Sequence, residues 1–261
     1  MDFTRAVVRV PGRTFAEGLS SAAEGPPDLG RALEQHALYV EALRECGLEV
    51  ASLEPEAAYP DSTFVEDTSI MTERGAILMR PGAPSRQGET ASMRLCLRKY
   101  YPELPAIEAP GTVDGGDICE ADGHYLIGVS ARTNGHGAHQ LAQHLHRWGY
   151  SSSIIDIRDN PALLHLKSGI AYLGGGLWVV QDGLEHELRS HAGIDVRDVI
   201  TVTPEEAYAA NCVRVNGAVL VAAGYPLVRA AIAARGHRVV ALEVSEFRKM
   251  DGGLSCLSLR F

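Results

Sequence analysis

The stretch 252-GGLSCLSLRF-261 joins a glycine pair to a run of alternating apolar residues, which predicts a β-strand at the end of the chain. Leu257, Leu259 and Phe261 share one face of this strand. Cys256 lies on the opposite face, because successive side chains of a strand point to opposite sides. Two interpretations remain open: Cys256 fills a second packed surface, or the strand presents its thiol to a functional site.

The same run lacks the second arm of a β-hairpin, and its natural partner is 5-RAVVRV-10. Their pairing would place both chain ends in one sheet, as in ring-shaped architectures that avoid open sheet edges. Four further stretches each contain two β-rich runs around a turn with Gly or Asn. They are 64-FVEDTSIMTERGAILMR-80, 115-GGDICEADGHYLIGVS-130, 168-SGIAYLGGGLWVVQ-181 and 211-NCVRVNGAVLVAA-223.

A segment with helical periodicity, followed by a β-rich run, recurs five times between these hairpins. The helical segments are 29–46, 88–101, 137–148, 183–191 and 226–235. The β-rich runs that follow them are 48–53, 104–109, 152–157, 198–203 and 237–244. The pattern predicts a single α/β domain, residues 1–261, built from five similar units around a pseudo-fivefold axis.

One unit carries an insertion, 12-GRTFAEGLSSAAEGPPD-28, which is rich in Gly, Ser, Ala and Pro. Long loops within a compact domain are usually functional or disordered. We predict that residues 12–28 form a mobile flap over the active site, with a disordered connector as the alternative.

The composition excludes several classes of function. The net charge is −9 and no basic stripe stands out, which argues against a nucleic-acid partner. The five cysteines are scattered without CxxC spacing, so neither a disulfide framework nor a zinc motif is indicated. The N-terminus lacks a signal-peptide pattern, and Pro226 and Arg229 interrupt the most apolar region, 217–234. We expect a cytoplasmic protein.

Chemically active residues occupy equivalent positions in the repeated units and would face one common centre. They are Glu66, Asp67, Asp114, Asp117, His165 and Cys256. Gathered carboxylates are costly unless a cation neutralises them, and that cation is either a metal or an organic base.

An organic cation fits this set better than a metal. A second His or Cys at a metal-binding spacing is missing, and four histidines within 136–146 read as a solvated helix face. A guanidinium presents planar donors that match paired carboxylates. A cysteine thiolate would attack it, and a neighbouring histidine would protonate the departing amine. Arg86 and Arg132 follow two of the hairpins and suit a carboxylate, so the ligand would be an arginine derivative.

Four motifs stand in the order FVEDT at 64–68, DGGDI at 114–118, LHLKSG at 164–169 and DGGLSCLSLRF at 251–261. The longer stretches PDSTFVEDT, RPGAPSRQGET, EAPGTVDGGDI, SARTNG and YAANC also follow one another along the chain. Together these motifs resemble the dimethylarginine dimethylaminohydrolase family. The resemblance runs from end to end. It implies the five-bladed β/α-propeller fold of the pentein superfamily, with pseudo-fivefold ββαβ units around a central channel.

The resemblance also implies the roles of the site residues. Cys256 matches the nucleophile that forms a thiouronium-type covalent intermediate. His165 matches the acid/base residue, and Asp114 matches the acid that orients this histidine. Some bacterial relatives have Glu at the position of Asp114. Seven further positions match substrate-binding residues. Glu66 and Asp67 match the contacts with the guanidinium, and Asp61, Arg86 and Arg132 match the residues that hold the α-amino and α-carboxylate groups. Leu19 and Met250 match positions that contact the amino-acid end partly through backbone.

The reaction that the resemblance implies is hydrolysis of asymmetric dimethylarginine or monomethylarginine to citrulline and the methylated amine, within arginine metabolism and nitric oxide regulation. No cofactor or metal is needed, although zinc could inhibit by binding the Cys–His pair. The expected partner is the small-molecule substrate, with no nucleic acid and no membrane, and a homodimer is the default oligomeric state.

Three alternatives stay open at the level of the sequence. Arginine deiminases have an FTRD-type sequence where this chain has FVED. An amidinotransferase would use the same covalent chemistry with an amine acceptor. A non-catalytic propeller would be a binding protein, but it would not need the set of Cys256, His165 and a carboxylate.

Overall fold

The computed structural model describes residues 2–161, 163–191 and 193–261, and the chain divides into two compact units. We call the unit that runs to Glu66 and resumes with Cys212–Phe261 the terminal unit. The unit formed by Asp67–Asn211 is the central unit.

The terminal unit contains two three-stranded sheets. The first has the order β14-β1-β2 and comprises β1 (Arg5–Arg9), β2 (Glu49–Leu53) and β14 (Leu259–Arg260). The second has the order β11-β12-β13 and comprises β11 (Val213–Val215), β12 (Ala218–Ala222) and β13 (Arg238–Leu242). The α-helices among the described residues of this unit are α1 (Leu29–Glu45), α5 (Pro226–Ala233) and α6 (Ser245–Arg248).

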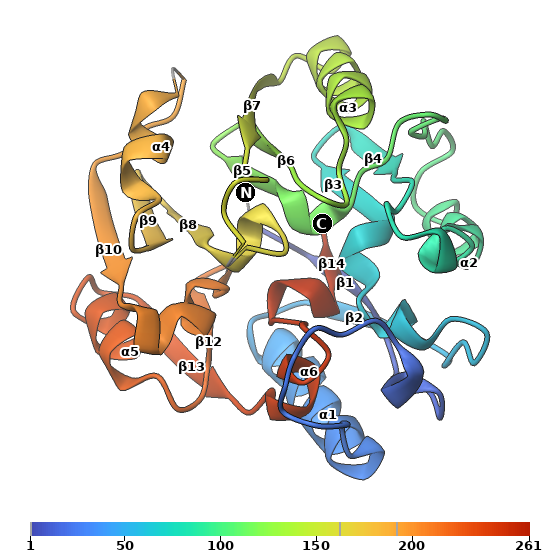
Figure 1. Ribbon diagram of the computed structural model, residues 1–261, viewed down its shortest axis with the longest axis horizontal. Helices are drawn as coiled ribbons and strands as arrows, with labels where there is room; N and C mark the ends of the chain where they lie inside the picture. Colours follow the sequence, from blue (N-terminus) through green and yellow to red (C-terminus); the bar gives the residue numbers. More distant parts are fainter. Residues whose placement is uncertain (1, 162, 192) are drawn as a thin grey trace. The chain divides into compact units, whose positions relative to one another are not determined.

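The first and the last described strands, β1 and β14, both lie in the first of these sheets. β1 pairs antiparallel with β14, with Ala6 opposite Arg260 and Val7 opposite Leu259, and it pairs parallel with β2 (Figure 1). The middle strand β1 is therefore bonded on both sides, and its apolar residues Ala6, Val7 and Val8 are fully buried.

The described residues of the central unit form three sheets. They are β3 (Ser69–Thr72) with β4 (Gly75–Leu78), then β5 (Ile118–Ala121) with β6 (His124–Val129) and β7 (Ser151–Asp156), and β8 (Ile170–Gly174) with β9 (Leu177–Gln181) and β10 (Asp198–Val202). The helices are α2 (Glu89–Leu97), α3 (Gly135–Arg147) and α4 (Glu185–Ser190).

A common pattern repeats in these sheets: an antiparallel hairpin, a helix, and a third strand parallel to the second arm. The pattern is present in the sheet of β5, β6 and β7, where α3 packs on β7 (Figure 1). It is present again in the sheet of β8, β9 and β10, where the helix is α4. The apolar face of α3 supports this arrangement, because Leu141 and Leu145 are fully buried against Ile127 of β6. The predicted succession of hairpin, helix and strand is confirmed in these elements.

One predicted β-rich run, 104–109, is not a strand. Only an isolated parallel bridge between Leu78 and Ala106 remains. Pro105 has no N–H to donate, and a proline within a run removes a ladder hydrogen bond. The sheet of β3 and β4 is therefore two-stranded.

The predicted strand around Cys256 is also wrong in its extent. Ser255–Leu257 form a short 3-10 helix, and β14 begins only at Leu259. The N–H of Cys256 bonds to the carbonyl of Gly253 at 3.2 Å, which closes the turn. The ring of Phe64 packs so closely on Gly252 that a Cβ there would lie 2.1 Å from it. The glycine pair thus admits a tight turn where alternation predicted extended backbone.

No helix among the described residues combines the length and apolarity needed to cross a bilayer.

Candidate active site

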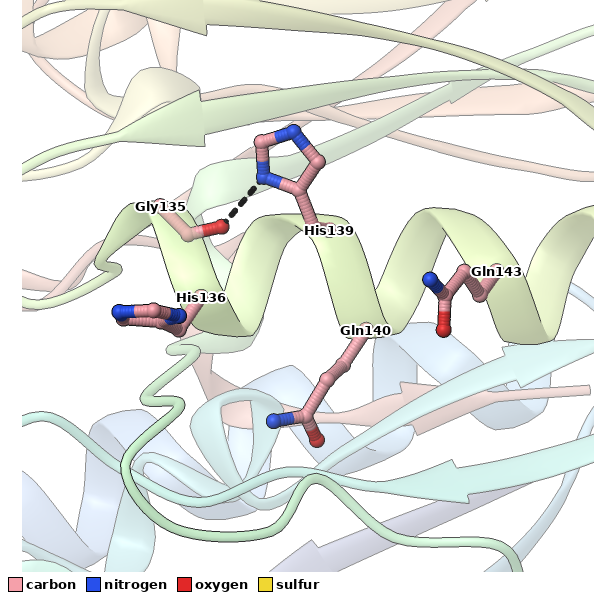
Figure 2. Close-up of a pocket in the computed structure, with 5 residues that line it drawn as sticks. All are labelled: Gly135, His136, His139, Gln140 and Gln143. Atoms are coloured by element: carbon pink, nitrogen blue, oxygen red, sulfur yellow. Dashed lines mark hydrogen bonds between the residues drawn. The ribbon is translucent and has the colours of Figure 1, made fainter.

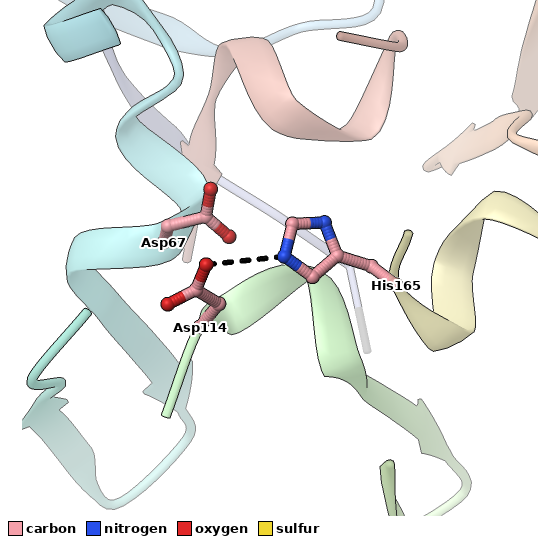
Figure 3. A group of neighbouring side chains, drawn as sticks. All are labelled: Asp67, Asp114 and His165. Carbon is pink, nitrogen blue, oxygen red and sulfur yellow. Dashed lines mark hydrogen bonds and ion pairs between the residues drawn. The ribbon is translucent and has the colours of Figure 1, made fainter. Parts of the chain in front are cut away.

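Asp67, Asp114 and His165 come together in the central unit (Figure 3). His165 directly precedes a 3-10 helix, Leu166–Ser168, and Asp114 directly precedes another, Gly115–Asp117. The Nε2 atom of His165 lies 3.1 Å from Oδ2 of Asp114, and all three side chains are buried. The structure thus places His165 against Asp114, its predicted partner, and also close to Asp67, which the sequence assigned to the guanidinium instead.

The surroundings of Asp114 fix its orientation. Its Oδ1 atom accepts a hydrogen bond from the N–H of Gly82 at 2.7 Å, which leaves Oδ2 for His165. The ring of His165 packs on the backbone of Gly116, where a Cβ would lie 2.8 Å from Cγ of the ring. Any larger residue at 116 would displace the histidine.

The carboxylates change the protonation of His165. Burial lowers its pKa, but the charges of Asp117 and Asp67 and the hydrogen bond with Asp114 outweigh burial and raise the pKa to about 9. His165 is therefore protonated at neutral pH and can act as a general acid.

Arg86 is buried between two carboxylates. Its Nη1 atom lies 2.6 Å from Oδ2 of Asp67, and its Nε and Nη2 atoms bond Glu89 at 3.0 and 2.9 Å. Burial raises the pKa of Asp67, but the charge of Arg86 and then that of His165 outweigh it and lower the pKa to about 2. Glu89 was not singled out in the sequence, although its position three residues after Arg86 on a helical turn could have indicated the pair.

Arg132 lies on the loop that follows β6 and is half-buried. Its N–H donates to Oγ of Ser130 at 2.9 Å. Gly82 packs against the backbone of this loop, because a Cβ on it would lie 2.2 Å from the carbonyl oxygen of Arg132. The residue that fixes Asp114 therefore also contacts the loop of Arg132.

In the terminal unit, Cys256 is half-buried at the middle of its 3-10 helix. The N–H of Gly253 lies 3.4 Å from its Sγ atom. The preceding residue, Ser255, donates its hydroxyl to Oε2 of Glu66 at 2.8 Å, and its oxygen lies 4.0 Å from Sγ. Ser255 thus connects the predicted nucleophile with a carboxylate predicted to bind the guanidinium.

A buried tyrosine of α1 holds both ends of this turn. The hydroxyl of Tyr39 donates to the carbonyl of Leu254 at 2.9 Å and lies 2.7 Å from Oγ of Ser258. Tyr39 is fully buried. Nothing in the sequence marks this contact, since it joins residues more than two hundred positions apart.

The three remaining predicted residues, Leu19, Asp61 and Met250, also gather in the terminal unit. The N–H of Leu19 lies 3.1 and 3.2 Å from the two carboxylate oxygens of Asp61. A Cβ on Gly18 would lie 2.4 Å from Asp61 Oδ1 and 3.1 Å from Cε of Met250. Residues 12–28 are therefore tied to the acid that the sequence predicts to bind the α-amino group.

The chain is similar over its whole length to known enzymes. It is 43% identical to the N(G),N(G)-dimethylarginine dimethylaminohydrolase of Pseudomonas aeruginosa, over 99% of this chain and 100% of that protein. A solved structure of the Pseudomonas aeruginosa enzyme, a cysteine-to-serine variant in complex with citrulline, superposes with a TM-score of 0.94 at 42% identity and covers 100% of both chains. The chain belongs to the dimethylarginine dimethylaminohydrolase family.

Two further matches agree with this membership. A histidine-to-glycine variant of dimethylarginine dimethylaminohydrolase, solved as an adduct with S-methyl-L-thiocitrulline, matches at a TM-score of 0.93 and 42% identity over 99% of this chain and 100% of that one. The family model described as arginine deiminase matches residues 57–199. The predicted family, the α/β pentein fold class and the hydrolase class are confirmed.

The resemblance to the family implies that the reaction needs no metal ion. Asp67, Asp114 and His165 each offer one ligand atom within 4.8 Å of the others. Their donors already have partners, however. Asp67 bonds Arg86 and the N–H of Gly116, and Asp114 bonds Gly82 and His165. A metal ion would have to displace a buried ion pair, so the donor set fits a metal poorly.

An open pocket of about 530 Å³ lies along α3 and has a different character (Figure 2). Its described lining residues are Gly135, His136, His139, Gln140 and Gln143, none of which carries a carboxylate. The Nδ1 atom of His139 lies 2.6 Å from the carbonyl of Gly135. His136 and His139 are exposed, as expected for a solvated helix face. The described lining of this pocket therefore offers no acid that could bind a guanidinium.

Proposed function

We propose that the protein hydrolyses Nω-methylated arginines, asymmetric dimethylarginine and monomethylarginine, to citrulline and dimethylamine or methylamine. The full-length likeness to an enzyme named for this reaction carries the proposal. The buried pair of Asp114 and His165 supports it, because the reaction needs an acid at the departing amine.

The first half-reaction replaces the methylated amine by sulfur. The thiolate of Cys256 attacks the guanidinium carbon and forms a C–S bond. Protonated His165 donates its proton to the departing nitrogen as the C–N bond breaks, so dimethylamine leaves as a neutral amine. The product on the enzyme is an S-alkylthiouronium intermediate, and His165 is now neutral.

The second half-reaction is hydrolysis. Neutral His165 takes a proton from a water molecule, whose oxygen attacks the same carbon. The tetrahedral intermediate loses its hydroxyl proton to solvent as the C–S bond breaks, so the thiolate of Cys256 is restored and neutral citrulline leaves. His165 ends protonated, so the cycle consumes one cationic substrate and one water molecule and releases one proton together with the two neutral products.

We propose that the substrate is held at both of its ends. Glu66 and Asp67 would bind the guanidinium, since both are buried carboxylates whose oxygens can accept a further hydrogen bond beside those from Ser255 and Arg86. Asp61, Arg86 and Arg132 would bind the α-amino and α-carboxylate groups, with Leu19 and Met250 contributing through backbone.

The flap, residues 12–28, would close over this amino-acid end. Its contacts with the turn before Cys256 support the assignment. The hydroxyl of Ser20 donates to the carbonyl of Lys249 at 2.7 Å, and the N–H of Ser21 donates to Asp251 at 2.6 Å. A segment tied to residues 249–251 can transmit substrate binding to the nucleophile's turn.

Citrulline formation tests the proposal. The protein is incubated separately with asymmetric dimethylarginine, monomethylarginine and arginine, alongside the variants Cys256→Ser and Cys46→Ser. We expect citrulline from the two methylated substrates, none with Cys256→Ser, and an unchanged rate with Cys46→Ser, a half-buried cysteine at the end of α1. Full activity of Cys256→Ser would show that Cys256 is not the nucleophile.

The match to the arginine deiminase model over residues 57–199 favours a second candidate, hydrolysis of unmethylated arginine. The chemistry would be identical except that ammonia leaves. Citrulline from arginine alone would assign this second function, whereas turnover of methylated substrates alone would exclude it.

We also propose that the protein acts in the cytoplasm as a homodimer, the commonest symmetric assembly. Sedimentation analysis distinguishes this dimer from a monomer.

A further inference from the structure

Asp117 is a fully buried carboxylate of the central unit that the proposed reaction does not use. It ends the 3-10 helix Gly115–Asp117, and its N–H bonds to the carbonyl of Asp114 at 3.1 Å. Burial of a carboxylate is costly unless hydrogen bonds compensate it, so its contacts indicate what it stabilises.

One oxygen of Asp117 holds the loop that carries Arg132. Its Oδ2 atom accepts hydrogen bonds from Oγ of Ser130 at 2.7 Å and from Oγ1 of Thr133 at 2.6 Å. Ser130 Oγ in turn accepts from the N–H groups of Arg132 at 2.9 Å and Thr133 at 3.1 Å. The loop is thus bound to Asp117 on both sides of Arg132.

The other oxygen holds the segment of His165. Oδ1 accepts from the N–H of Leu166 at 3.0 Å, directly after the histidine. The absence of a side chain at Gly128 makes room for this contact, because a Cβ there would lie 3.3 Å from Oδ1 and 3.0 Å from Cβ of Leu166. Thr133 also contacts Asp114, the partner of His165. Its Oγ1 atom accepts a hydrogen bond from the N–H of Asp114 at 3.1 Å.

The charge of Asp117 also reaches His165. Burial raises the pKa of Asp117, and the charge of His165 with the hydroxyl and backbone donors opposes this rise. The charged groups around His165 are Asp117, Asp67 and Asp114, with Arg86 behind Asp67. Of the three carboxylate charges, that of Asp117 raises the pKa of the imidazole most, and Asp114 adds a hydrogen bond to its own charge.

We propose that Asp117 is a positioning residue that holds His165 and the Arg132 loop in one arrangement, so that acid catalysis and substrate binding depend on the same carboxylate. This inference rests on the proposed function for its kinetic consequences. Its structural part, the link between Asp117 and His165, concerns the enzyme without substrate.

An NMR titration of the His165 imidazole tests that link directly, with His165→Gln used to assign the signal. In Asp117→Asn we expect the midpoint to fall by about one pH unit or more, because an opposite charge next to the imidazole is lost. Asp182→Asn removes an exposed carboxylate of the same unit and should leave the midpoint unchanged. An unchanged midpoint in folded Asp117→Asn would overturn the proposal.

Kinetics with asymmetric dimethylarginine separate the two roles. Asp117→Asn should lower kcat by about 10- to 100-fold, less than the whole contribution of a general acid, and raise KM. Thr133→Val keeps the charge of Asp117 but removes one of its hydrogen bonds, so it should raise KM several-fold while the His165 midpoint stays in place. If Asp117→Asn does not fold, Thr133→Val decides, and an unchanged KM there would overturn the proposal.

Failure of the proposed function would look different. If the wild-type protein forms no citrulline from methylated arginines, the function is wrong, while a lowered His165 midpoint in Asp117→Asn still supports the link. If turnover is normal and the midpoint does not move, only the role of Asp117 is wrong.

Discussion

His165 owes its chemistry to the three carboxylates that surround it. Burial alone would leave a neutral imidazole, which could not protonate a departing amine. Asp117, Asp67 and Asp114 reverse that effect. The same groups predict how activity and stability respond to pH.

Activity should fall as the pH rises through about 9, because His165 then loses the proton that the departing amine requires. Asp114→Asn removes a hydrogen bond and a charge that raise this pKa, so the basic limb of the pH profile of kcat/KM should move to lower pH. At pH 8 we expect kcat/KM of Asp114→Asn to be lower than that of the wild type by about tenfold or more. A basic limb at the same pH in the variant would contradict the assigned partner.

Stability should follow the same group. The pKa of His165 is about 9 in the folded protein and near 6.5 when unfolded, so the folded state binds more protons between these values. The contribution of the protonated imidazole is complete below pH 6.5 and is lost as the pH rises toward 9. Thermal melts between pH 6.5 and 9 should therefore show a larger decline for the wild type than for His165→Gln, and equal declines would count against the raised pKa.

At the scale of secondary-structure elements, short turns rather than strands carry the site residues. Asp114 and His165 precede 3-10 helices, and Cys256 lies within one. Such turns hold side chains less rigidly than a sheet does, so contacts from other segments must fix them. Tyr39 at the turn of Cys256 and Gly18 beside Asp61 are two such contacts.

Tyr39→Phe should loosen the turn of Cys256 without changing the shape of the core. The variant lacks the hydroxyl that donates a hydrogen bond to the buried carbonyl of Leu254, so its free energy of unfolding should fall by about 1–2 kcal/mol. We also expect slower adduct formation at Cys256 with a thiol-reactive substrate analogue. Tyr101→Phe removes a hydroxyl from the central unit and serves as the control. Equal adduct rates in the wild type and Tyr39→Phe would show that Tyr39 supports the fold alone.

Gly18→Ala should weaken substrate binding. Its φ of −67° suits alanine, so the substitution acts through the added methyl group, which would lie 2.4 Å from Asp61 Oδ1. Overpacking of this kind costs about 1–3 kcal/mol, and we expect KM to rise about tenfold. Gly217→Ala places a methyl group where no atom lies within 4 Å and should leave KM unchanged. A normal KM in Gly18→Ala would separate the flap from substrate binding.

At the scale of the whole molecule, no step of the proposed reaction uses a metal ion. Each of the four carboxylate oxygens of Asp67 and Asp114 already accepts a hydrogen bond or ion pair. Prolonged treatment with a chelator should therefore leave the rate of citrulline formation unchanged, while added zinc should inhibit. Loss of activity on chelation, restored by metal, would assign the carboxylates to a metal site instead.

Much of this molecule could be predicted from local patterns in the sequence. Helical periodicity placed α1 and α3, and paired β-rich runs placed the hairpins, because these signals depend on neighbours in the chain. The predicted strand at 104–109 was wrong because Pro105 interrupts the ladder, and the extended backbone at Cys256 was wrong because the glycine pair allows a turn.

The site could be predicted only in part. Motifs indicated which residues matter, but not which of them bond to one another. The pairing of Arg86 with Asp67 and the contacts of Asp117 join segments that packing alone brings together. No spacing rule predicts such contacts.

The central claim is that Cys256 becomes covalently attached to the substrate carbon. Rapid acid quenching during turnover of asymmetric dimethylarginine, followed by peptide mass spectrometry, tests it most directly. We predict a thiouronium-type adduct on the peptide that contains Cys256, and none on the peptides of Cys46, Cys96, Cys119 or Cys212. Citrulline formed at full rate with an adduct on another cysteine, or by a Cys256→Ser protein, would contradict the account.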